Sequence, residues 1–170
     1  AFQIEKYEVA ITQLEDLKEL DPDYYSAYLL LAQSYSMLED NKRALIAVEE
    51  GLARDEYDKA LYLFAGKMAL KTQQEEKAMN YLQQAIALDP EYMEATIVLM
   101  GTYNQREMYG EIIDLYETLE REQIEFTAIL PIVANAYNED EQFEKANSLY
   151  ALAYNELNED TEFLETYCYF

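Results

Sequence analysis

The sequence predicts an all-α fold, a solenoid of antiparallel helix pairs, and three observations support that prediction. Glu, Leu and Ala are the commonest of the 170 residues, while only four Gly and three Pro occur, which favours helix over strand. The sequence also matches itself when it is shifted by 34 residues, and apolar residues within each period fall at helical spacing. A period of this size is typical of a solenoid whose repeats stack on one another.

The register of 34 is visible as columns of matching residue types. Small residues form two columns and tyrosines dominate a third, with one large side chain interrupting each small column. The columns are Ala10, Ala44, Ala78, Ile112 and Ala146; Ala32, Gly66, Met100 and Ala134; and Tyr35, Ala69, Tyr103 and Tyr137. Chance does not hold several columns in phase over four periods, so the chain is a repeat array.

The apolar spacing places the helices in order along the chain. We expect the second helix of a partial repeat (1–24), full repeats at 25–58, 59–92, 93–126 and 127–160, and the start of a further repeat at 161–170. Each full repeat holds two helices, for example 59–71 with 75–88, which makes ten helices in all. Connections of about three to five residues make successive helices antiparallel. Because neither end has its pairing helix, we expect a fragment of a longer protein.

Three prolines and two large residues add detail to this prediction. Pro22 and Pro90 stop one helix, and the aspartate before each suits the start of the next helix through capping and the helix dipole. If Thr127 caps the first helix of the fourth repeat, Pro131 lies about one turn inside it and costs one hydrogen bond. In the third repeat, Met100 opposite Ile112 predicts a wider spacing between the two helices.

The pattern resembles the tetratricopeptide repeat, which has a small residue on each helix, aromatic or large residues beside them and a closing proline. The first full repeat carries Tyr28, Leu31, Ala32, Tyr35, Ala44, Val48 and Gly51, and the second carries Tyr62, Gly66, Ala78, Leu82, Ala85 and Pro90. The resemblance covers essentially the whole chain. It implies a right-handed superhelix of antiparallel helix pairs.

The charge of the chain restricts its partners. A net charge of −23 repels phosphate backbones and anionic lipid surfaces and steers basic partners towards the chain, so we expect no nucleic acid. The plainer alternative is that the acidic surface only maintains solubility. No window approaches the roughly 18 apolar residues of a membrane helix, so we expect no membrane insertion. The single cysteine, Cys168, fits a reducing, cytoplasmic location.

The sequence predicts no enzyme, metal site or cofactor. It contains no histidine, and its four glycines are scattered rather than gathered into a phosphate-binding loop. Acidic pairs such as Glu49/Glu50, Glu75/Glu76 and Asp140/Glu141 fall on expected turns and exposed helix faces, where they lack the cleft that catalytic carboxylates need. Cys168 falls in the small column and is expected to pack there, with a reactive thiol as the alternative.

The resemblance implies that a peptide binds on the concave surface made by the first helices. The candidate partner-binding residues on that surface are Leu30, Gln33, Met37, Phe64, Lys67, Lys71, Val98, Asn104, Gln105, Ile132, Asn135 and Asn138. Two alternatives stay open for the apolar row formed by Leu30, Phe64, Val98 and Ile132: it contacts a ligand, or it is buried between first helices. Lys67 and Lys71 either bind an anion or neutralise nearby acids.

The predicted function is therefore a non-catalytic scaffold or adaptor. It would bind a peptide or helix of a partner protein, one that is basic or has apolar anchors, on its concave face. The alternative is a structural self-association module that forms homo-oligomers, a homodimer among them, through its exposed ends or its concave face.

Overall fold

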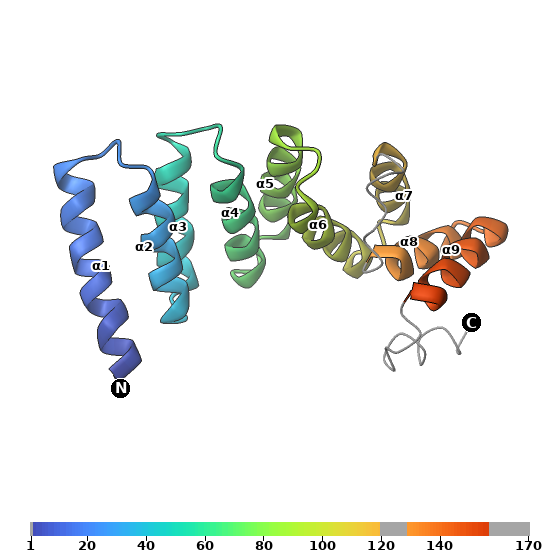
Figure 1. The fold of residues 1–170 in the computed structure, drawn as a ribbon, viewed down its shortest axis with the longest axis horizontal. Helices are drawn as coiled ribbons and strands as arrows, with labels where there is room; N and C mark the ends of the chain where they lie inside the picture. The colour runs from blue at the N-terminus through green and yellow to red at the C-terminus, as the bar shows by residue number, and fades with distance from the viewer. Residues whose placement is uncertain (1, 120–128, 157–170) are drawn as a thin grey trace. The chain divides into compact units, whose positions relative to one another are not determined.

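The computed structural model describes residues 2–119 and 129–156, which form α-helices joined by turns and contain no strand (Figure 1). The first helices of the repeats are α2 (Ser26–Met37), α4 (Lys59–Lys71), α6 (Met93–Gln105) and α8 (Leu130–Glu139). The second helices are α1 (Phe2–Leu20), α3 (Asn41–Leu52), α5 (Glu75–Leu88), α7 (Tyr109–Thr118) and α9 (Phe143–Glu156). The all-α prediction is confirmed, and the tenth predicted helix, at 161–170, lies outside the described residues.

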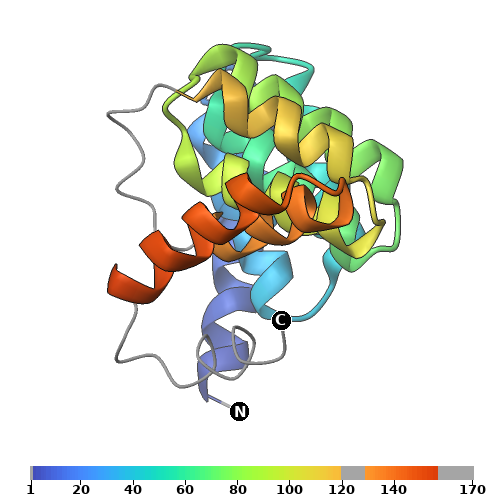
Figure 2. The same ribbon diagram turned by 90° about the vertical axis from the view of Figure 1, so that its right-hand side faces the viewer.

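The chain divides into two compact units, Ala1–Ala95 and Thr96–Phe170. In unit 1, α1 to α5 pack in sequence order, each against the next, and α2 also contacts α4. In unit 2, α8 packs against both α7 and α9, and the last pair lies side by side in both views (Figure 2). The division falls within α6, in the third repeat, where Met100 and Ile112 interrupt the small columns. The repeat boundaries, the right-handed superhelix and the wider spacing of this repeat stay predictions.

The small columns lie where helices approach closely. Ala32, Ala44 and Ala78 are completely buried. A Cβ atom built on Gly66 would lie only 2.7 Å from Cγ of Leu82, so a side chain at this position would force Leu82 to shift, and α4 and α5 pack closely here. The sequence columns therefore report the helix-helix contacts of unit 1.

The turn between the two helices of each repeat contains a residue in the left-handed backbone conformation, which its residue type does not predict. The second residue after each first helix is left-handed, with φ between 57° and 61°, although none is glycine: Glu39, Gln73, Glu107 and Glu141. In each case the next residue donates its N–H back to the carbonyl five positions earlier, as in Asp40 to Tyr35 at 3.0 Å and Gln142 to Tyr137 at 2.8 Å. These are Schellman caps, whose left-handed position normally holds glycine.

Glycine at these turns should therefore stabilise the array. Relief of left-handed strain at a non-glycine residue exceeds the entropy that glycine adds to the unfolded chain, so Gln73→Gly should raise the free energy of unfolding by about 0.5–1 kcal/mol. The matched control is Gln84→Gly, at an exposed position within α5, where glycine should cost about 1 kcal/mol. Urea denaturation measures both variants, and a Gln73→Gly variant as destabilised as Gln84→Gly would contradict this prediction.

The aspartates between repeats act differently from the prediction. Asp21, Asp55 and Asp89 each accept a hydrogen bond from the backbone N–H two residues later, at 3.3, 3.0 and 3.1 Å. They close local turns and do not cap the following helix. The cap of α4 is Asp58, whose carboxylate accepts from Ala60 and Leu61.

The expectation for Pro131 was wrong. Helix α8 begins at Leu130, so Pro131 is its second residue, in the first turn. The N–H groups of that turn have no intrahelical acceptor, and a proline there loses no hydrogen bond. The proposed cap, Thr127, lies outside the described residues.

Candidate functional site

Charge divides the two kinds of helix. Helix α2 contains no charged residue, and the charged residues of α4 are all lysines. The acids in the described first helices are Glu94 and Glu139, and each lies near a helix end. Every described second helix carries at least two acids. The negative charge of the chain is thus concentrated away from the first helices.

On α2, three candidate residues form one exposed stripe. Leu30 is 47% exposed and Met37 is 58% exposed, with Gln33 exposed between them. Their spacing of three and four residues puts them on the same side of the helix. Two apolar side chains in water beside an amide make this stripe suitable for a partner with apolar anchors.

On α4, the candidates divide into core and surface. Phe64 is half-buried and packs against the core of unit 1. Lys67 forms an ion pair with Glu94. Of the two alternatives for this lysine, binding an anion or neutralising a nearby acid, the contact corresponds to the second. Lys71 is exposed, and its Nζ donates to Ser36 Oγ on α2 at 3.4 Å. We call Leu30, Gln33, Met37, Lys67 and Lys71 the first-helix face of unit 1.

In unit 2 the candidates are less accessible. Val98, Ile132, Asn104, Asn135 and Asn138 are all half-buried. The Asn135 amide donates to Asn104 Oδ1 at 3.4 Å, so these two side chains partly satisfy each other. Gln105 is exposed at the end of α6.

A cluster of three polar side chains that the sequence did not predict occurs twice in the structure. Tyr137 donates to Glu117 Oε1 at 3.1 Å, with Lys145 Nζ 4.7 Å from the centre of its ring. The same bond, at 3.1 Å, joins Tyr35 to Glu15, and Arg43 lies 4.7 Å from that ring. Each member of the Tyr35 trio precedes its counterpart in the Tyr137 trio by 102 residues, which is three periods of 34. Matching columns of acids and of cations were therefore the available signal in the sequence.

Burial and the Glu117 hydrogen bond raise the pKa of Tyr137 to about 12. Burial and the Glu15 hydrogen bond likewise raise the pKa of Tyr35. Both phenols therefore stay protonated and keep donating to their carboxylates at neutral pH. The trios join neighbouring helices and do not supply an acid or base for chemistry.

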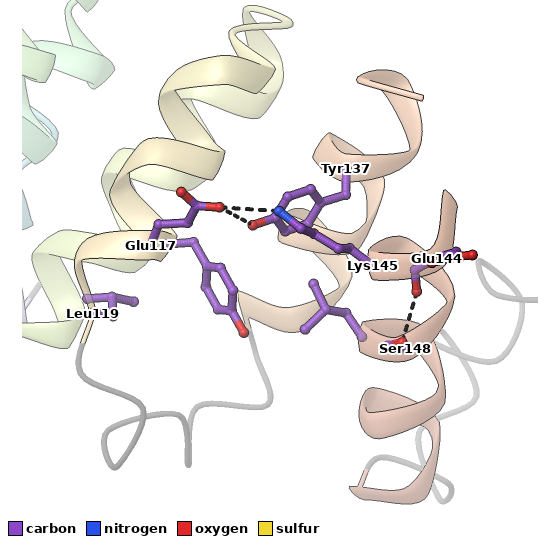
Figure 3. A pocket seen from close by; sticks show the side chains of 8 residues that line it. Glu117, Leu119, Tyr137, Glu144, Lys145 and Ser148 are labelled. Atoms are coloured by element: carbon purple, nitrogen blue, oxygen red, sulfur yellow. Dashed lines mark hydrogen bonds and ion pairs between the residues drawn. The ribbon is translucent and has the colours of Figure 1, made fainter. Parts of the chain in front are cut away.

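The Tyr137 trio lines a pocket of about 760 Å³ in unit 2 (Figure 3). Its lining residues are Tyr116, Glu117, Leu119, Tyr137, Glu144, Lys145, Ser148 and Leu149. Figure 3 shows the Glu117 carboxylate directed at both Tyr137 and Lys145, and Ser148 donating back to the Glu144 carbonyl. Glu117, Tyr137 and Lys145 are bonded to one another, so their contacts connect α7, α8 and α9 at this pocket.

The described ranges contain neither a metal-binding cluster nor a membrane-spanning helix. No group of three or more Asp, Glu, Cys or His side chains in residues 2–119 and 129–156 could hold a metal ion. No helix in the same ranges is long and apolar enough to span a bilayer.

Antiparallel helix pairs with a 34-residue register and small residues at the helix crossings define a tetratricopeptide repeat protein, and the comparisons agree. The chain is similar to the TPR repeat-containing protein YpiA of Bacillus subtilis (strain 168), with 41% identity over all 170 residues. It spans 40% of the length of that relative. The family described as YpiA-like, C-terminal tetratricopeptide repeats matches residues 132–170. The sequence and the fold of this chain both resemble those of the tetratricopeptide repeat proteins.

Solved structures support the same fold. MamA superimposes with a TM-score of 0.77 at 19% identity, covering 92% of this chain and 91% of MamA. YrrB, described as a TPR protein with an unusual peptide-binding site, superimposes with a TM-score of 0.76 at 22% identity, covering 94% of this chain and 82% of YrrB. At these identities the likeness concerns the fold alone.

Proposed function

We propose that this chain is a non-catalytic adaptor that binds a segment of a partner protein on the first-helix face of unit 1. The observation that supports this most directly is the exposed stripe of Leu30, Gln33 and Met37 on a helix without charge. YrrB, which shares the fold, is described as having a peptide-binding site.

The chemistry of the face favours an extended or helical segment with apolar anchors. Leu30 and Met37 lose exposed apolar surface when a partner side chain covers them, which is the main source of affinity in such contacts. Gln33 offers an amide donor and acceptor for the partner backbone. Phe64, half-buried against the core of unit 1, is less accessible than these three residues.

A random-peptide phage selection on the full chain tests this function. The wild type should enrich a peptide pool, and Leu30→Asp with Met37→Asp should weaken binding of that pool more than tenfold, because two apolar contacts are replaced by charge. Ile46→Asp, at a 55% exposed position on the second helix α3, is the control and should bind like the wild type. Far-ultraviolet circular dichroism confirms that all variants fold. Equal binding by the double variant and the wild type would refute the proposed site.

Self-association is the second candidate function, and α1 favours it. Ile4 and Val9 are 52% and 57% exposed. Ala10 and Leu14 are half-buried, whereas their counterparts one period later, Ala44 and Val48, are completely buried. Light scattering over a range of concentrations tests it, since a mass that stays at the monomer value would rule out a homo-oligomer.

A further inference from the structure

We propose that one edge of unit 1 is a second docking surface, which binds a segment of a partner protein through the lysine or arginine side chains of that segment. We call this surface the tyrosine edge. It consists of the turns that follow α1, α3 and α5, at residues 21–25, 53–58 and 89–92, with the helix ends beside them. Figure 1 shows these turns at the upper end of the helices of unit 1. The surface is separate from the first-helix face, so the inference does not depend on the proposed function.

Ion pairs connect the three turns into one surface. The Asp23 carboxylate in the first turn lies 4.0 Å from Nη1 of Arg54 in the second. Lys59, the residue after the second turn, pairs with Asp89 in the third. Side chains of all three turns can therefore contact the same partner segment.

The tyrosine edge exposes large apolar and aromatic side chains. Leu20 is 84% exposed and Tyr57 is 75% exposed. The turns at the opposite ends of the helices, at residues 38–40 and 72–74, expose no large apolar side chain. Exposed apolar surface of this kind marks an interaction site, and tyrosine rings attract cations to their faces. The large apolar and aromatic side chains exposed on the tyrosine edge are Leu20, Tyr24, Tyr25, Tyr57 and Leu88.

Charge complementarity identifies a basic segment as the occupant of this edge. Acids outnumber cations in the three turns, where Arg54 is the cation. A lysine or arginine side chain can pair with a carboxylate and cover a tyrosine ring in one contact. A second copy of this chain does not fit, because two such acidic edges repel each other. The acids of the three turns are Asp21, Asp23, Asp55, Glu56, Asp58, Asp89 and Glu91.

The third turn already holds a cation of the chain itself in this way. The Lys59 ammonium pairs with the Asp89 carboxylate and lies 5.0 Å from the centre of the Tyr92 ring. The same Asp and Tyr occur 68 residues earlier, which is two periods, as Asp21 and Tyr24. In both turns the aspartate also accepts the backbone N–H two residues later, so the local geometry matches. No cation in the described ranges pairs with Asp21 or lies over the Tyr24 ring. This pair is therefore the position at which a lysine or arginine of the partner binds.

A fluorescent peptide in which arginine alternates with glycine tests this inference, because it carries no apolar anchor for the first-helix face. Fluorescence anisotropy should show that the full chain binds the peptide. Asp21→Asn and Tyr24→Leu should each weaken binding about threefold, as expected for an exposed ion pair and an exposed cation–π contact. Asparagine at position 21 can still accept the Asp23 N–H, so the turn is kept.

Each variant has a matched control. Glu8→Gln removes the same charge as Asp21→Asn from an exposed position on α1. Tyr154→Leu makes the same aromatic change as Tyr24→Leu at an exposed position on α9. Both controls should bind the peptide like the wild type, and far-ultraviolet circular dichroism confirms that all variants fold.

Lys59→Gln should act in the opposite direction. It frees Asp89 and Tyr92, which then form a second position for an arginine of the same peptide, so binding should tighten about threefold. Lys42→Gln removes the same charge from an exposed position on α3 and should tighten binding much less.

The comparison with controls separates the tyrosine edge from general attraction by the net charge of −23. A wild-type chain that does not bind the peptide would overturn the inference. An affinity of Asp21→Asn, Tyr24→Leu or Lys59→Gln equal to that of its control would overturn it as well.

Discussion

Replacing Leu82 by alanine should lower the free energy of unfolding of unit 1 by about 3–4 kcal/mol. Leu82 is completely buried on α5 and faces Gly66 on α4. Removal of its branched end leaves a cavity against a glycine, which has no side chain to move into the space. We therefore expect the loss of unfolding free energy to be well above the smallest loss seen when a buried leucine is replaced by alanine. Urea denaturation at neutral pH measures it.

Two controls make this prediction specific. Leu88→Ala removes the same atoms from a 39% exposed side chain on the same helix and should change stability by no more than about 0.5 kcal/mol. Gly66→Ala places a methyl group 2.7 Å from Leu82 Cγ in the wild type, but in Leu82→Ala that atom is gone. There the added methyl should recover about 1 kcal/mol through helix propensity. Equal costs for Leu82→Ala and Leu88→Ala would show that the small columns do not mark tight helix crossings.

The second large effect is alkaline destabilisation of unit 2 through Tyr137. Its pKa is raised to about 12 in the folded protein, above the ordinary value near 10 in an unfolded chain. A raised phenol pKa means that the folded state holds the proton more tightly. The resulting stability is present below pH 10 and is lost as the pH rises from 10 to 12, to a total of about 2–3 kcal/mol.

A difference measurement isolates Tyr137 from the other alkaline titrations. The free energy of unfolding of Tyr137→Phe minus that of the wild type should rise by about 2 kcal/mol between pH 9 and pH 12, because phenylalanine has no proton to lose. Tyr24→Phe, which removes a phenol at a 47% exposed position, is measured in parallel as the control. A difference for Tyr137→Phe that does not change with pH would contradict the Tyr137–Glu117 hydrogen bond.

The fold was predictable because its determinants repeat. Small residues such as Ala32, Ala44 and Gly66 are needed where helices cross, and each recurrence of the 34-residue period strengthens the same signal. The prediction that Pro131 costs a hydrogen bond was wrong for a local reason. The effect of a proline depends on where the helix begins, and apolar spacing defines helix starts poorly. The left-handed turns were hidden because Glu and Gln occupy positions where glycine is the usual marker.

The candidate site was predictable as a set of columns but not as a surface. The sequence places Leu30 and Phe64 in one column, yet Leu30 is exposed and Phe64 packs against the core. Their difference depends on how neighbouring helices cover each position, which periodicity does not encode. The same applies to Lys67 and Lys71: their spacing suggests a pair, whereas Glu94 neutralises only Lys67. Long-range ion pairs follow from the packing of separate helices.

The six methionines allow a direct test of the central claim, that a partner segment binds the first-helix face of unit 1. Met37 is 58% exposed on that face, whereas Met68, Met79, Met93 and Met100 are buried and Met108 is half-buried in a turn. The measurement is a methyl-methionine nuclear magnetic resonance titration of the full chain with a peptide from the wild-type selection. We expect the Met37 methyl resonance to move most, while those of the four buried methionines stay nearly fixed. Saturating peptide that leaves the Met37 resonance unmoved would contradict the account.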